Sequence, residues 1–333
     1  MSGLDAIGRG AVILLGAVVA VAVGTILFGV VPAETTLGPL EVLLVVLVVV
    51  LGIVLSGRIA GQVFPGYNVA EVSVDGAITQ SGDSPSPLPG GNSAASDDIV
   101  EQIEKADADS NAEALILNMN TPGGEVVASE DIRYAAEQFD GPTVAYATNL
   151  CASGGMWIAS GCDEFHAREG SRVGSIGVNG IMFGAEGTLD KLGLEYRRFV
   201  SGDYKDTPSA FRDLREDERE YWQGLLDQWY DQFIETVAEG RDVDPETARE
   251  TEARIYLGTE AREIGLVDTL GPRDEMEENL AAELGVDEIR VEEFEPERGL
   301  QEKLSVVATR VARGFGRGVA SVFVDDGHPN GRV

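Results

Sequence analysis

The sequence predicts an α/β fold in which a parallel sheet follows a helical hairpin. Two long apolar runs lie within the first 58 of the 333 residues. Segments with strand-like and helix-like spacing then alternate, which is typical of a parallel sheet with crossover helices. No repeat of fixed period is present, so the part after the hairpin is predicted to be one domain of about 230 residues, followed by a tail.

The apolar runs predict a transmembrane hairpin. Residues 11–31 carry no charge and are long enough to cross a hydrocarbon core as a helix, and residues 40–55 are interrupted only by Glu41. A cleaved signal peptide is the alternative for the first run, but the only basic residue before it is Arg9 and no clear cleavage site follows. We therefore expect residues 1–58 to anchor the chain in the cell membrane as a multi-pass protein.

The side of the membrane is less strongly indicated. Arg9 and Arg58 flank the hairpin, whereas the connecting loop carries only Glu34. The positive-inside rule then favours a cytoplasmic location for both chain ends. Two arginines are a weak basis, so the side of the catalytic domain stays open.

Residues 66–298 are expected to form the α/β domain. In chain order the spacing predicts a strand over 69–78, a flexible loop over 81–96, a capped helix over 97–106, a buried strand over 114–119, a helix over 126–139 and a buried strand over 143–147. A highly charged helix is predicted from Asp213 to Arg241, with an apolar stripe that packs on the sheet or on a neighbouring subunit.

The charge excludes one class of partner. The chain has 57 acidic and 25 basic residues, a net charge of −32, which would repel nucleic acid. Its only lysines are Lys105, Lys191, Lys205 and Lys303. An acidic, lysine-poor chain is typical of proteins from a salt-rich cytosol, where salt screens the self-repulsion; an ordinary acidic protein is the alternative.

Cysteine and histidine provide no framework for a metal or for disulfides. Cys151 and Cys162 belong to no CxxC pair, and the chain has only two histidines, His166 and His328. We expect no cofactor and no metal site.

The most informative segment for chemistry is CASGG at residues 151–155. It follows the predicted strand that ends at Ala147 and precedes a segment that can start a helix at Met156. Ser153 is therefore expected at a strand-to-helix turn that exposes its hydroxyl. Small residues at a tight crossing are the alternative, because they are as often needed for packing.

A second glycine pair, Gly123 and Gly124, also ends a predicted strand. The ends of parallel strands line one edge of the sheet, where active sites gather. A backbone N–H from this pair, together with that of Gly154, could form an oxyanion hole. A simple Pro-Gly turn is an equally good interpretation at this point.

Lys205 is the candidate base. It lies in the turn-like segment SGDYKDTP at residues 201–208 of a chain that has very few lysines. A buried lysine can lose its proton and accept one from a serine, whereas arginine stays charged. A solvated surface lysine is the alternative.

Together these motifs resemble the signal peptide peptidase A family, the serine–lysine membrane peptidases. The resemblance covers roughly residues 68 to 285 and rests on the opening strand at Val69 and on NMNTPGG at 118–124, ASGG at 152–155, VGSIG at 173–177, SGDYKD at 201–206 and YLGTEAREIGLVD at 256–268.

The resemblance implies a Clp-protease or crotonase-like fold built from repeated β-β-α units. It makes Ser153 the nucleophile, Lys205 the general base and Ser175 the serine that hydrogen-bonds the lysine. It assigns the glycines at 123, 124 and 154 to the oxyanion region. Family members also assemble into rings, so a homo-oligomer is expected. Two predicted membrane spans depart from the single anchor that is usual in the family.

The expected function is hydrolysis of signal-peptide remnants or other short apolar peptides at the lipid bilayer, through an acyl-enzyme. A crotonase-like acyl-CoA enzyme and a non-catalytic membrane scaffold are the alternatives. Residues 299–333 form a separate basic tail with apolar residues at near-helical spacing. This tail is expected to lie on an anionic membrane surface or to dock on the acidic protein.

Overall fold

The computed structural model describes residues 3–27, 39–63, 66–81 and 93–296. The chain divides into two units, Met1–Phe294 and Glu295–Val333. The predicted basic tail, the linker between the apolar runs and most of the predicted loop after residue 81 lie outside the described residues.

The two apolar runs are helices that pack against each other. Helix α1 spans Gly3–Thr25 and helix α2 spans Pro39–Val63, so α1 begins before the predicted run and α2 continues past its predicted end. Gly16 contacts Ser56, and neither Gly16 nor Gly52 leaves room for a Cβ at the contact between the helices. Both helices are long and apolar enough to cross a membrane.

A largely parallel sheet forms the centre of the domain. Its strands are β10 (Val291–Glu293), β1 (Val69–Asp75), β4 (Ala114–Thr121), β5 (Thr143–Ala152), β6 (Glu164–Ala167) and β9 (Thr269–Leu270), in that spatial order. All of these pairs are parallel, as predicted. The predicted strand over 69–78 is interrupted at Gly76, where φ is +95°, and β2 (Ala77–Thr79) pairs separately with β3 (Ser93–Ala95).

One part of the sheet differs from the predicted parallel arrangement. The end of β5 leaves β6 and pairs with β7 (Arg172–Gly174), which in turn pairs antiparallel with β8 (Ile255–Leu257). This pairing joins segments about 80 residues apart in the chain, a separation at which local hydrophobic spacing carries no information on strand direction.

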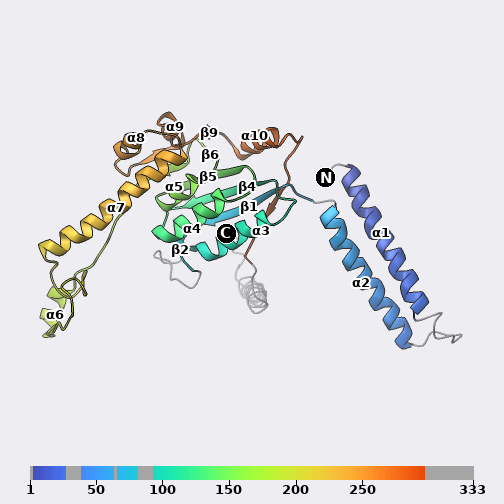
Figure 1. Ribbon diagram of the computed structural model, residues 1–333, viewed down its shortest axis with the longest axis horizontal. Coiled ribbons are helices and arrows are strands. Elements are labelled where there is room, and N and C mark those ends of the chain that lie inside the picture. Colours follow the sequence, from blue (N-terminus) through green and yellow to red (C-terminus); the bar gives the residue numbers. More distant parts are fainter. Residues whose placement is uncertain (1–2, 28–38, 64–65, 82–92, 297–333) are drawn as a thin grey trace, which may run out of the picture. The chain divides into compact units, whose positions relative to one another are not determined.

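Helices cover both faces of the sheet. On one face lie α3 (Ser96–Asp107), α4 (Val126–Glu137), α5 (Gly154–Ala159) and the end of α7 (Glu216–Gly240), and on the other lies α10 (Arg273–Leu284). Figure 1 shows α3 and α4 together on one side of the strands and α10 on the opposite side. The alternation along β4 explains this: Leu115 and Leu117 belong to the larger core, whereas Ile116 belongs to the core beneath α10.

Helix α7 buries apolar side chains near its end and exposes aromatic side chains nearer its start. Near its end, Phe233, Ile234 and Val237 are buried in the core, as the apolar stripe predicts. Nearer its start, Tyr221 and Trp229 are exposed. Three short helices complete the described elements: α6 (Glu186–Leu192), α8 (Pro245–Glu250) and α9 (Gly258–Glu263).

Candidate active site

Ser153 lies at the turn between β5 and α5. Strand β5 continues to Ala152, five residues beyond its predicted end, and α5 begins at Gly154. Ser153 itself has φ 53° and ψ −118°, a conformation that non-glycine residues rarely adopt and that concentrates at functional sites. Its N–H donates to the carbonyl of Gly174 at 2.9 Å, which ties the turn to β7.

The Pro-Gly-Gly segment lies directly against this turn. Gly123 has φ +90°, and a Cβ there would lie 2.5 Å from the N of Gly154 and 2.7 Å from the Cβ of Ser153. A Cβ at Gly154 would in turn lie 3.2 Å from the N of Gly124. The structure thus brings together Ser153 and the three glycines that the sequence analysis assigned to the oxyanion region.

The three glycines have different hydrogen-bond states. The N–H of Gly123 donates to Thr121 Oγ1 at 3.0 Å, so it is occupied. Within the described residues, the N–H groups of Gly124 and Gly154 have no hydrogen-bond acceptor. Two free donors beside a serine hydroxyl are the arrangement that stabilises a tetrahedral oxyanion.

A small cavity of about 100 Å³ borders Ser153. Apolar side chains on its wall come from four different segments: Val126, Trp157, Val178 and Phe233. The rings of Trp157 and Phe233 pack with centroids 4.7 Å apart, so helix α7 reaches the cavity through the apolar side chains near its end. Sequence spacing did not identify these residues, because they meet only through tertiary packing.

Ser175 lies near the same turn, and Lys205 does not reach it. Ser175, with φ 55°, directly follows Gly174, whose carbonyl binds the N–H of Ser153. Lys205 lies in an exposed turn, and it is absent from the residues that line the Ser153 cavity. Within the described part of the chain, its amine forms no hydrogen bond with Ser153 or Ser175.

The other nucleophilic and basic side chains nearby are structural. Cys151 is fully buried, and burial raises the pKa of its thiol far above the usual range, so the reactive thiolate is disfavoured. His166 is also buried, and its ring nitrogens are hydrogen-bonded to Thr269 Oγ1 at 2.7 Å and to the Gly271 carbonyl at 3.1 Å. Neither residue is available to Ser153.

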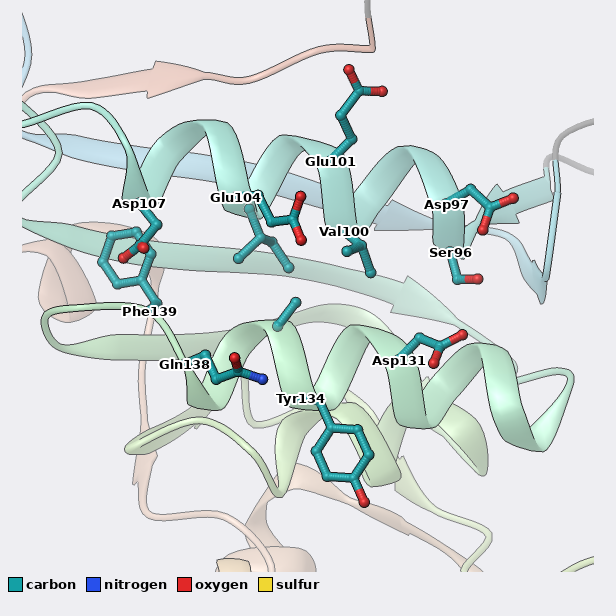
Figure 2. Close-up of a pocket in the computed structure, with 12 residues that line it drawn as sticks. Ser96, Asp97, Val100, Glu101, Glu104, Asp107, Asp131, Tyr134, Gln138 and Phe139 are labelled. Carbon is teal, nitrogen blue, oxygen red and sulfur yellow. The ribbon is translucent and has the colours of Figure 1, made fainter.

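A larger groove of about 490 Å³ lies between α3 and α4 (Figure 2). Carboxylates line it from both helices: Asp97, Glu101, Glu104, Asp107 and Asp131. Among the residues that the structure describes, it shares no lining residue with the Ser153 cavity, and no lysine, histidine or cysteine lines it.

Comparisons with known proteins find relatives that are named as proteases. The sequence profile of Peptidase family S49 matches residues 135–287, which include Ser153, Ser175 and Lys205. A Methanocaldococcus jannaschii protein named as a protease is 31% identical over 240 residues, covering 71% of this chain and 75% of that protein. A Synechocystis protein named as a protease is 39% identical over 184 residues, covering 54% of this chain and 66% of that protein.

Further relatives bear more specific names. An Enterococcus faecium protein named as signal peptide peptidase SppA is 31% identical over 230 residues, covering 68% of this chain and 66% of that protein. A solved structure of a mutant 1510-N membrane-bound stomatin-specific protease aligns with 63% of this chain and 83% of its own chain, at a TM-score of 0.39 and 19% identity. The family profile and the relatives together show that the chain belongs to peptidase family S49, the family of signal peptide peptidase SppA, and is a serine peptidase.

Proposed function

We propose that this serine peptidase is a membrane-anchored endopeptidase that hydrolyses short apolar peptides, such as signal-peptide remnants, with a Ser153–Lys205 dyad. The observation that carries the proposal is the strained turn at Ser153, with the free N–H groups of Gly124 and Gly154 beside it. The apolar walls of the adjoining cavity suit a small apolar side chain of the substrate.

The chemistry follows from these groups. Ser153 Oγ attacks the scissile carbonyl while the neutral amine of Lys205 accepts the hydroxyl proton. The N–H groups of Gly124 and Gly154 stabilise the oxyanion, and the lysine returns the proton to the departing amine. Water, deprotonated by the same lysine, then attacks the acyl group, and the lysine passes that proton to the departing Ser153 Oγ, which restores both residues. Ser175 accepts an N–H of the lysine and orients it.

Among the described residues, Lys205 does not line the Ser153 cavity of its own chain, which favours delivery of the lysine by a second copy of the chain. Lys205 belongs to an arm, residues 180–212, that carries many exposed large side chains: Ile181, Met182, Phe183, Leu192, Leu194, Tyr196, Phe199, Val200, Tyr204 and Phe211. Phe183 and Phe199 are 84% and 92% exposed, a density of exposed apolar surface that marks a protein interface. We infer that the arm packs on a neighbouring copy and delivers Lys205 to that copy's Ser153.

The hairpin of α1 and α2 supports the anchoring part of the proposal. Its apolar segments, Gly8–Thr25 and Val42–Gly61, are largely exposed to the surroundings of the protein. Confinement to the bilayer would raise the effective concentration of membrane-bound peptides near the enzyme. Protease accessibility in sealed vesicles would test the cytoplasmic location that Arg9 and Arg58 favour.

Ser153→Ala is expected to abolish both peptide hydrolysis and labelling by a serine-reactive fluorophosphonate, because the nucleophile is lost. The measurement is in-gel labelling together with turnover of an apolar fluorogenic peptide. The control is Ser110→Ala, which removes an exposed serine on the surface and should leave both signals intact. Labelling of the Ser153→Ala protein at native intensity would assign the reactive serine to another position, whereas a native protein that takes up no label would favour a non-catalytic scaffold.

Lys205→Arg is expected to be as inactive as Lys205→Ala, since arginine keeps the positive charge but cannot act as a base. Loss of general-base catalysis lowers the rate by ~10² to 10⁴. The matched control is Lys191→Arg, at an exposed lysine of α6 in the same arm, which should retain native kcat. Native turnover by Lys205→Arg would show that the charge alone is needed.

A further inference from the structure

One sequence neighbour of Lys205 is held by the start of helix α7, and the other is held by arginines of the arm. On one side, the Tyr204 hydroxyl donates to Asp217 Oδ2 at 3.2 Å, and its ring packs on Tyr221 with centroids 5.2 Å apart. On the other side, the carboxylate of Asp206 accepts hydrogen bonds from Arg198. The turn that carries the lysine is therefore fastened on both sides of it, although Lys205 itself is exposed.

A chain of ion pairs leads from Asp206 to a buried carboxylate. Arg212 binds both Asp206 oxygens, at 3.1 and 3.2 Å, and both Glu218 oxygens, at 2.6 and 2.7 Å. The Glu218 side chain is 0% exposed and also accepts the N–H of Arg215 at 3.0 Å. Ion pairs that exclude water and use the arginine fork are better ordered than single surface pairs.

Asp206, the carboxylate closest to Lys205 in sequence, belongs to this chain of ion pairs. Hydrogen bonds from Arg212 and Arg198 hold the pKa of Asp206 well below its usual range, so it stays ionised and paired with arginine. The turn that carries Lys205 is thus attached to two arginines through the charged side chain of Asp206.

We propose that Glu218 is a positioning residue for the lysine base, acting through Arg212 and Asp206 to fix the Lys205 turn to helix α7. This inference rests on the proposed Ser153–Lys205 dyad. Glu218 lies on the helix whose other end, at Phe233, lines the Ser153 cavity of its own chain. Helix α7 then fixes both the Ser153 cavity of its own chain and the Lys205 turn that reaches the neighbouring copy.

Glu218→Gln is expected to lower kcat on the order of 10²-fold with KM unchanged, because a displaced base slows the chemical step and leaves peptide binding intact. The amide of Gln can still accept the N–H of Arg215, so the start of the helix is preserved. Asp231→Asn is the matched control. Asp231 lies on α7, as Glu218 does, and its exposed ion pair with Arg249 is removed, so kcat should be unchanged. Asp206→Asn, in the exposed turn, is a second variant and should reproduce the kcat loss.

Co-expressed chains separate positioning from general destabilisation. In a mixture of Ser153→Ala and Lys205→Ala chains, Glu218→Gln should lower activity only when it is placed on the Ser153→Ala chain, which supplies Lys205. An equal loss on either chain, or a raised KM instead of a lowered kcat, would overturn the positioning role.

Variants tested one at a time distinguish failure of the positioning role from failure of the Ser153–Lys205 dyad. Native kcat in both Glu218→Gln and Asp206→Asn, with Lys205→Ala still inactive, would overturn the positioning role and leave the dyad standing. Native kcat in Lys205→Ala would overturn the dyad itself. If the mixture regains no activity, the kcat and KM of the single-chain Glu218→Gln enzyme still decide the positioning role.

Discussion

Co-expression of Ser153→Ala and Lys205→Ala chains is expected to restore roughly a quarter of native peptide hydrolysis, although each variant alone is inactive. In an equal mixture, an interface has about a one-in-four chance of joining an intact Ser153 to an intact Lys205 from the next copy. Since loss of the base costs ~10² to 10⁴ in rate, the recovered signal should exceed that of either variant by well over tenfold.

The control for this experiment is a mixture of Lys205→Ala with the Ser153→Ala, Lys205→Ala double variant, which contains no intact lysine at residue 205 and should stay inactive. The measurement is turnover of an apolar fluorogenic peptide by membranes that contain both chains. Activity no higher than that of the single variants would place both dyad residues within one copy. The arm would then have to move, because Lys205 forms no hydrogen bond with Ser153 in the described chain.

The parallel sheet could be predicted because its central strands are buried on both faces. Residues 115–117 and 144–147 are apolar or aromatic and have 3% exposure or less, and such runs bounded by turn residues are typical of parallel strands. The end of β5 could not be predicted. There Thr148 and Asn149 interrupt the apolar run, and the strand continues by pairing with β7 and, at Cys151, with Thr121 of β4.

The contact between the Ser153 turn and the glycine pair could also be predicted, because its signal is local. Gly123, Gly124 and Ser153 lie at the ends of two neighbouring strands, and parallel strands bring those ends to one edge. Which of the glycine N–H groups are free and which is already hydrogen-bonded could not be predicted. It depends on the φ of +90° at Gly123 and on Thr121, whose hydroxyl accepts the Gly123 N–H and is itself fixed by the Gly76 carbonyl at 2.6 Å.

The surroundings of Lys205 could not be predicted from the sequence. Its scarcity identified it as a candidate, but a sequence does not say which copy of a chain uses a residue. The charges at the start of α7 have the pattern of a solvated helix face, yet Glu218 is 0% exposed beneath two arginines. Ion pairs between residues six positions apart, across a turn and a helix start, have no periodic signal.

Gly123→Ala is expected to lower kcat by ~10² to 10³, the cost of losing an oxyanion donor, even though the Gly123 N–H is not itself free. The added methyl group would lie 2.5 Å from the N of Gly154 and 2.7 Å from the Cβ of Ser153, so the turn must shift. That shift moves the nucleophile and one free donor together. The measurement is kcat for peptide hydrolysis, with thermal unfolding recorded in parallel.

Gly285→Ala is the matched control for backbone strain. Gly285 has φ +69° at the end of α10, and nothing lies within 4 Å of a Cβ there. Both substitutions force alanine into the left-handed region, at a cost of roughly 1–2 kcal/mol. Both proteins should therefore lose stability, but only Gly123→Ala should lose kcat. Equal kcat in the two variants would mean that Gly123 serves folding alone and that the oxyanion donors tolerate movement of the Ser153 turn.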